Sequence, residues 1–271
     1  MIIRFIKIFI SVLYLCFKKV LLFVFKTSSN QHCVVLYYHS VLESEKERFL
    51  RQLNYLSSKY CFVSLNSFNS INSKKNLISI TFDDGLSSIL LNALPELIKR
   101  RIPTTIFVPA ARIGDYPKWE QKRQEIYHND RILNCDEIKE LADQGIEIGS
   151  HTLHHTDLRN VTSEAAREEF NLSKSLLEKI TGKDVVSFSF PYGSFNDELI
   201  NQALDCGYGF VYTTEPEMIS LPTKRKVFGR VGVNPDDSRL EFRLKAAGAF
   251  SWLPTVSRWK AKVKKFLSFQ S

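Results

Sequence analysis

The chain has 271 residues, is 44% hydrophobic and carries a formal net charge of +8, which suits one globular domain with an appendage. It shows no repeat or low-complexity tract, and five scattered cysteines without CxxC spacing argue against a disulfide framework and for a reducing compartment. Much of the positive charge lies near the two ends, which favours an anionic surface as partner and argues against nucleic acid held in a central groove.

The first 26 residues, MIIRFIKIFISVLYLCFKKVLLFVFK, are apolar but interrupted by lysine and arginine. On a helix, with about 100° per residue, Arg4, Lys7, Ser11 and Lys18 fall on one face. This predicts a membrane-associating segment over residues 1–28, an amphipathic helix lying in the membrane plane with its basic edge on anionic lipid. Its apolar runs are too short to span a bilayer unaided, but a tilted signal anchor and a cleaved export signal remain alternatives.

Short apolar runs recur along the middle of the chain, as in strands buried on both faces of a parallel sheet. The predicted strands are Val34–Tyr38, Leu77–Phe82, Thr104–Val108, Ile146–Gly149, Val185–Phe190, Phe210–Thr213 and Val227–Val231. Helical patterns lie between several of them, over 49–56, 87–100, 134–144, 163–181 and 196–206. This alternation predicts an α/β fold, either a barrel or a doubly wound sheet. The polar stretch 111–131 is a substrate-facing loop or a surface excursion.

The C-terminal stretch 252-WLPTVSRWKAKVKKFLSFQ-270 mixes bulky apolar side chains with five lysines and arginines. We assign residues 241–271 to a basic amphipathic segment outside the central domain. It either shares a membrane surface with the first helix or packs one apolar side on the domain.

Polar side chains stand at the ends of three predicted strands, in Asp83-Asp84-Gly85, in the histidine-rich turn after Gly149, and in 191-PYG-193. In parallel α/β barrels reactive groups gather at the C-terminal strand ends. His151 and His155 are four residues apart and can share a metal ion, and one carboxylate, Asp84, would complete a hydrolytic His₂-carboxylate site. Asp83 would be the base, so a metal cation would explain why two aspartates stand side by side.

Taken in order, 81-TFDDG-85, 151-HTLHH-155 and 190-FPYG-193 resemble the motifs of the polysaccharide deacetylase family, carbohydrate esterase family 4. The resemblance implies a distorted (β/α)₇ barrel over residues 33–240 that removes N- or O-acetyl groups from sugars with a divalent metal, usually zinc. It implies that Asp83 is the general base and that His154 is only a spacer. It also implies that the backbone N–H near Tyr192 helps to hold the oxyanion. The implied metal ligands are Asp84, His151 and His155.

Two positions depart from the family pattern. Many members carry an arginine where this chain has Ser189, and Arg230 is our candidate for the replacement, against a purely structural arginine. The usual C-terminal histidine, the general acid, is missing. A circularly permuted branch of the family takes that histidine from an early strand, and 34-VVLYYHSV-41 matches it, so we predict His39 as the acid, against a structural hydrogen bond.

The leading interpretation is a sugar deacetylase, acting on N-acetyl groups of an acetylated saccharide or a lipid-linked glycan. An anionic membrane surface is the expected second partner, and we expect no nucleic acid. The expected location is the cytoplasmic face of the inner membrane, with an exported, anchored enzyme as the alternative. A non-catalytic carbohydrate-binding protein and a deformylase of a lipid-linked amino sugar remain open as other functions. The sequence does not indicate an oligomeric state.

Overall fold

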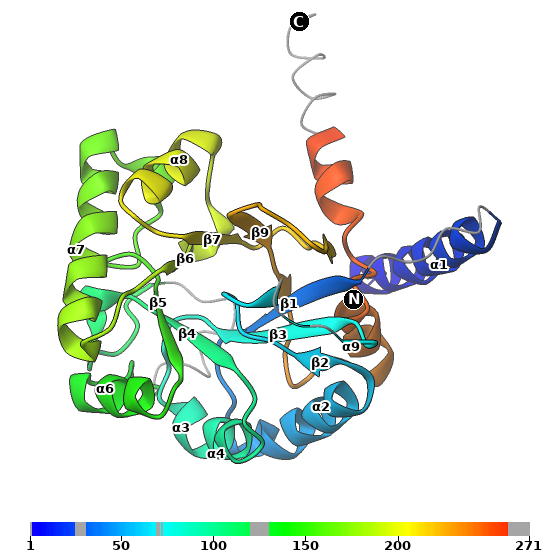
Figure 1. The fold of residues 1–271 in the computed structure, drawn as a ribbon, viewed down its shortest axis with the longest axis horizontal. Coiled ribbons are helices and arrows are strands. Elements are labelled where there is room, and N and C mark those ends of the chain that lie inside the picture. The colour runs from blue at the N-terminus through cyan, green and yellow to red at the C-terminus, as the bar shows by residue number, and fades with distance from the viewer. Residues whose placement is uncertain (1, 25–30, 69–70, 72, 120–129, 260–271) are drawn as a thin grey trace, which may run out of the picture.

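The computed structural model describes residues 2–24, 31–68, 71, 73–119 and 130–259. One sheet is rolled into a nearly closed barrel, and most helices lie around its outside (Figure 1). This is the predicted distorted (β/α)₇ barrel, with the predicted N-terminal helix beside it.

The barrel strands run mainly parallel, in the order β10-β1-β3-β4-β5-β6-β7-β9. Their bounds are β1 His32–Tyr38, β3 Leu77–Phe82, β4 Thr104–Val108, β5 Glu147–Ser150, β6 Ser187–Ser189, β7 Phe210–Thr213, β9 Val227–Gly229 and β10 Val231–Gly232. Two short additions, β2 Cys61–Phe62 and β8 Ile219–Ser220, pair with β3 and β1 and were not predicted from the sequence. Two-residue strands carry too little hydrophobic periodicity to be recognised.

The barrel closes at Arg230, between β9 and β10. The predicted strand 227–231 is present, but it is divided: β9 pairs with β7, and β10 pairs with β1. Arg230 lies between the two pieces, and its N–H donates to the carbonyl of Thr213 at 3.0 Å. One stretch of chain therefore joins both edges of the sheet and brings Arg230 to the C-terminal strand ends.

The helices have the bounds α1 Ile2–Val24, α2 Lys46–Lys59, α3 Ser88–Asn92, α4 Leu94–Lys99, α6 Cys135–Asp143, α7 Ser163–Thr181, α8 Asp197–Asp205 and α9 Arg239–Ala246. Asn134 and Asn196 cap α6 and α8 as expected, each accepting a backbone N–H three residues on. The single helix predicted over 87–100 is wrong, because α3 ends and α4 begins around Ala93. Pro95 lacks an N–H and its ring clashes with the preceding turn, so a continuous helix is disfavoured there.

The two terminal segments contact the barrel. The expected boundary at residue 240 falls inside α9, whose Phe242 and Ala246 pack in the main core. α1 lies beside α9 and projects outward (Figure 1). Across the ranges that the structure describes, no helix combines the length and apolar character needed to cross a bilayer. Parts of the expected segments 1–28, 111–131 and 241–271 lie outside the described residues.

Candidate metal centre

The turn after β3 separates the two adjacent aspartates. Asp84 and Gly85 both have positive φ, 67° and 61°, and a side chain on Gly85 would meet Val108 at 3.1 Å. Asp83 and Asp84 are both almost fully buried, yet they contact different groups. Asp84 faces two histidines, and Asp83 faces an arginine. The turn thus gives each carboxylate its own partner and relieves the repulsion between them.

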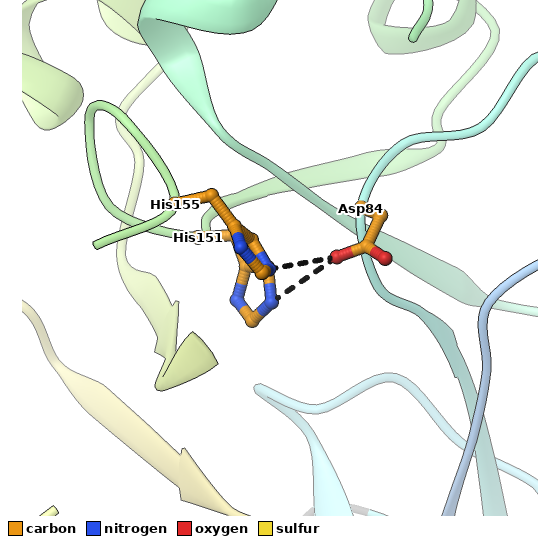
Figure 2. A group of neighbouring side chains, drawn as sticks. All are labelled: Asp84, His151 and His155. Carbon is orange, nitrogen blue, oxygen red and sulfur yellow. Dashed lines mark ion pairs between the residues drawn. The ribbon is translucent and has the colours of Figure 1, made fainter. Parts of the chain in front are cut away.

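Asp84, His151 and His155 form a buried cluster whose ligand atoms all lie within 4.8 Å of one another. Figure 2 shows both imidazoles directed toward one carboxylate oxygen of Asp84. His155 Nε2 lies 3.1 Å and His151 Nε2 3.5 Å from Asp84 Oδ1. Two ligands bound tetrahedrally at about 2.0–2.1 Å stand roughly 3.3 Å apart. The donor set and its spacing therefore fit a divalent ion such as zinc.

The other nitrogen of each imidazole is also occupied. His151 Nδ1 donates to the carbonyl of Ser189 at 2.8 Å, and His155 Nδ1 lies 3.2 Å from the Tyr192 hydroxyl. Hydrogen bonds of this kind fix the ring and leave the Nε2 lone pair for a metal. They come from the last residue of β6, Ser189, and from the turn after it, Tyr192, so the third sequence motif and the residue before it orient the histidines of the second.

The protonation states of these ligands suit metal binding. Burial lowers the pKa of His151 to about 4, so this imidazole is neutral at pH 7. Burial would raise the pKa of Asp84, but nearby imidazoles, His155 first, hold it well below its usual range. A neutral histidine and an ionised carboxylate are the forms that ligate metals.

The histidine loop is strained and is held by Glu169 of α7. Thr152 and His155 both have positive φ, an uncommon conformation for residues other than glycine. Glu169 accepts the backbone N–H groups of Leu153 and His154 at 2.8 and 3.0 Å, and it contacts the His154 ring at 2.8 Å. His154 therefore anchors the loop. Sequence reasoning missed Glu169, since its only signal is an acid beside Phe170 on the buried side of a helix.

Asp83 is paired with Arg230, which is completely buried. The guanidinium donates to both carboxylate oxygens, at 2.7 and 2.8 Å, and also to the hydroxyls of Thr81 and Ser189. Burial would raise the pKa of Asp83, but Arg230, together with His151 and His39, lowers it below its usual value. Arg230 thus stands beside Ser189, the position at which the resemblance to the family led us to expect an arginine.

His39 and Tyr192 lie near the cluster with different exposure. His39, just after β1, is half-buried, packs edge-on against Tyr37 with ring centroids 5.7 Å apart, and lowers the pKa of both Asp83 and Asp84. Tyr192 has φ 59° and an exposed ring that packs against His155. The acid role of His39 and the oxyanion role of the Tyr192 backbone stay predictions.

Trp119 covers one side of the cluster. Its ring stacks on His155 with centroids 3.9 Å apart and planes 17° from parallel. Sequence reasoning gave this residue no role, although it belongs to the stretch 111–131 for which a substrate-facing loop was one of two interpretations. At Trp119 that stretch reaches the metal cluster, whereas residues 120–129 lie outside the described part.

Comparison with known proteins places these motifs in a family. The family model for polysaccharide deacetylase matches residues 70–211. The peptidoglycan-N-acetylmuramic acid deacetylase PdaA of Bacillus subtilis is 29% identical over 164 residues, which is 60% of this chain and 54% of that protein. The poly-beta-1,6-N-acetyl-D-glucosamine N-deacetylase of Staphylococcus aureus is 26% identical over 211 residues, 73% of this chain and 69% of that protein.

The solved structure of IcaB from Ammonifex degensii shares the fold. It aligns with a TM-score of 0.66 and 28% identity, and the alignment covers 82% of this chain and 98% of that one. The chain spans about half the length of PdaA and of a second Bacillus subtilis relative, YxkH, with which it is 31% identical over 165 residues.

Proposed function

The chain belongs to the polysaccharide deacetylase family, and from that premise we propose that it is a metal-dependent hydrolase that removes N-acetyl groups from a saccharide. One observation carries the proposal: a buried Asp84–His151–His155 cluster adjoins a carboxylate, Asp83, that a buried arginine keeps ionised. Together they supply a metal site and a base at the C-terminal strand ends, where barrel enzymes react.

Each group has one task in this reaction. When bound, a divalent ion, zinc in our proposal, polarises the acetyl carbonyl and lowers the pKa of water. Asp83 accepts the proton of the attacking water, and Arg230 fixes the orientation of its carboxylate. His39 donates a proton to the departing nitrogen, and the backbone N–H of Tyr192 binds the carbonyl oxygen as it becomes negative. The products are acetate and a free amino sugar.

A polymer or a lipid-linked precursor is our proposed substrate. The named relatives act on amino-sugar polymers, peptidoglycan and poly-beta-1,6-N-acetyl-D-glucosamine. A cavity of about 480 Å³ lies along β9, lined by Thr213, Gly229 and Phe195 together with Tyr14 and Lys18 of α1. The metal ligands and Asp83 are not among its lining residues, so it is not the reaction site itself. Because α1 forms one wall, a substrate attached to a membrane lipid could lie along it.

We place the enzyme at a membrane surface on the cytoplasmic side, with an exported, anchored form as the alternative. The excess of lysine and arginine near both ends supports this location, because the cytoplasmic leaflet carries negative potential.

Acetate release tests the function. With oligomers of N-acetylglucosamine, we expect equal amounts of acetate and free amine, loss of both after chelation, and recovery when zinc is added. The control variant His151→Ala/His155→Ala should bind no metal and release nothing. Saccharide binding without acetate release by the zinc-loaded protein would identify a carbohydrate-binding protein instead. Formate release from a formylated amino sugar would identify a different acyl group.

His39→Ala tests the proposed acid. On an N-acetyl substrate the rate should fall about 10²-fold or more, since an amine must be protonated to leave. On an aryl acetate ester the loss should be small, because a phenolate leaves without that proton. Initial rates on both substrates measure the difference, with His32→Ala, at the other end of β1, as the matched control. Equal small losses on the two substrates would return His39 to a structural role.

A further inference from the structure

Helix α1 is attached to the rest of the molecule by its polar face. Arg4 Nε donates to Glu241 at 2.6 Å, and Lys18 Nζ lies 3.0 Å from the sulfur of Met218. Midway along, the Trp252 indole N–H donates to the hydroxyl of Ser11 at 3.0 Å, and Ser11 is completely buried. These positions are seven residues apart, so one face of the helix meets the domain along about four turns.

Apolar side chains on the same side complete the attachment. Ile8, Val12 and Leu15 pack against a small cluster of Leu244, Ala249 and Phe250. At helical spacing these side chains lie between the polar anchors. The orientation of α1 on the domain is therefore fixed by packing as well as by hydrogen bonds.

The opposite face of α1 is apolar and bare. Phe9 and Phe17 are 65% and 63% exposed. The other large apolar side chains exposed on this helix are Ile2, Ile3, Phe5, Ile6, Leu13, Val20 and Leu21. We call these nine residues the outer stripe. A continuous apolar surface of this kind on an otherwise folded domain indicates an interaction surface.

We propose that the outer stripe of α1 inserts into one leaflet of a lipid bilayer, with the helix in the membrane plane and the barrel held beside it. The helix lies in the membrane plane as predicted, but two of its basic residues have a different role from the predicted one. The sequence analysis predicted that Arg4 and Lys18 contact lipid headgroups, but in the structure they contact Glu241 and Met218 of the domain. Lys7 is exposed and can still reach the headgroups. The apolar side chains, rather than the basic edge, therefore carry the binding.

Charge favours a bilayer over a second copy of the chain as the occupant. A symmetric dimer through the outer stripe would bring together two chains of net charge +8 with their basic ends, and like charges oppose association. A leaflet containing anionic lipid attracts the same charge while its acyl chains cover the stripe. The inference concerns location alone and depends on none of the catalytic residues.

Vesicle co-sedimentation of the full chain tests the inference. We expect binding to vesicles of phosphatidylcholine alone as well as to a mixture with phosphatidylglycerol, and binding that persists at high salt. Phe9→Glu/Phe17→Glu should weaken binding at least about tenfold, because two buried aromatic rings are lost. Leu91→Glu, a change at a 74% exposed leucine on α3, is the matched control and should bind as the wild type does.

Three outcomes would overturn the inference. Unchanged vesicle binding by Phe9→Glu/Phe17→Glu would exclude the outer stripe, and so would binding that needs anionic lipid and disappears at high salt. Sedimentation velocity without lipid should show a monomer, whereas a dimer that the double variant dissociates would assign the stripe to a second copy. Acetate release by the soluble Phe9→Glu/Phe17→Glu variant should be unchanged, which would show that its fold is intact. Phe5→Ser/Leu13→Ser, at two other residues of the outer stripe, is an independent test and should also weaken vesicle binding.

Discussion

Asp83→Asn is expected to lower the rate of acetyl hydrolysis by at least about 10²-fold, because the amide cannot accept the proton of the attacking water. Zinc binding should be largely retained, since the ligands Asp84, His151 and His155 are untouched. Initial rates of acetate release and the zinc content of the purified variant measure the two effects.

A matched control separates the loss of a base from the loss of any buried carboxylate. Asp130 is also buried and accepts hydrogen bonds from the hydroxyl of Ser87 and the N–H of Ser88, and it is not one of the metal ligands. Asp130→Asn should leave the rate within a few-fold of wild type. Full turnover by Asp83→Asn, with zinc bound, would remove the base from its assigned role.

Arg230→Gln should lower the free energy of unfolding of the metal-free protein by about 3–5 kcal/mol at pH 7, because it leaves the Asp83 carboxylate buried without its partner. The arginine makes four side-chain hydrogen bonds, and its guanidinium lies over the rings of Tyr37 and Phe107, at 4.7 and 5.0 Å from their centroids. Urea unfolding in the presence of a chelator measures the change.

The difference in the free energy of unfolding between wild type and Arg230→Gln should shrink as the pH falls. In the wild type, Arg230 holds the pKa of Asp83 below its ordinary value, so this stabilisation is present above about pH 4 and is lost as pH falls through the lowered pKa. In Arg230→Gln, burial is the main remaining effect and raises the pKa of Asp83 above its unfolded value. As the pH is lowered, Asp83 of the variant therefore becomes protonated at a higher pH than Asp83 of the wild type. The variant then no longer holds a buried, unpaired charge, so its stability approaches that of the wild type in acid.

Arg225→Gln is the matched control for this arginine. Arg225 forms a comparable pair with Glu217, but on the surface, where salt bridges contribute about 0–1 kcal/mol. If Arg230→Gln lowered the free energy of unfolding no more than Arg225→Gln does, and by the same amount at every pH, the stability of the buried pair would not depend on the arginine charge.

Departures from the family motifs are connected in space. Ser189 stands where the resemblance to the family predicts an arginine, and its hydroxyl accepts a hydrogen bond from Arg230, which lies between β9 and β10. A small residue at 189 leaves room for a long side chain from 230. The geometry is consistent with Arg230 as the replacement, while the permuted-branch assignment, with His39 as its acid, stays a prediction.

The sequence by itself determined the barrel strands, most helix positions and the three motifs. Buried parallel strands are recognisable because they are continuously apolar, and the helix caps at Asn134 and Asn196 are local hydrogen bonds. The break in the predicted helix at 87–100 could have been read from Pro95, because its effect is also local. The spacing of the two metal-ligand histidines in 151-HTLHH-155 needs only a short loop, so it can also be recognised from the sequence.

Only the tertiary structure decided which remote groups meet. Glu169 holds the histidine loop from 13–16 residues away, Trp119 covers His155, and Arg230 reaches Asp83 across 147 residues of chain. Helical periodicity found the two faces of α1 but not which one is buried. Arg4 and Lys18 point inward because acceptors on other elements receive them. Such contacts depend on where separate elements pack, and the pattern within one element cannot specify its neighbour.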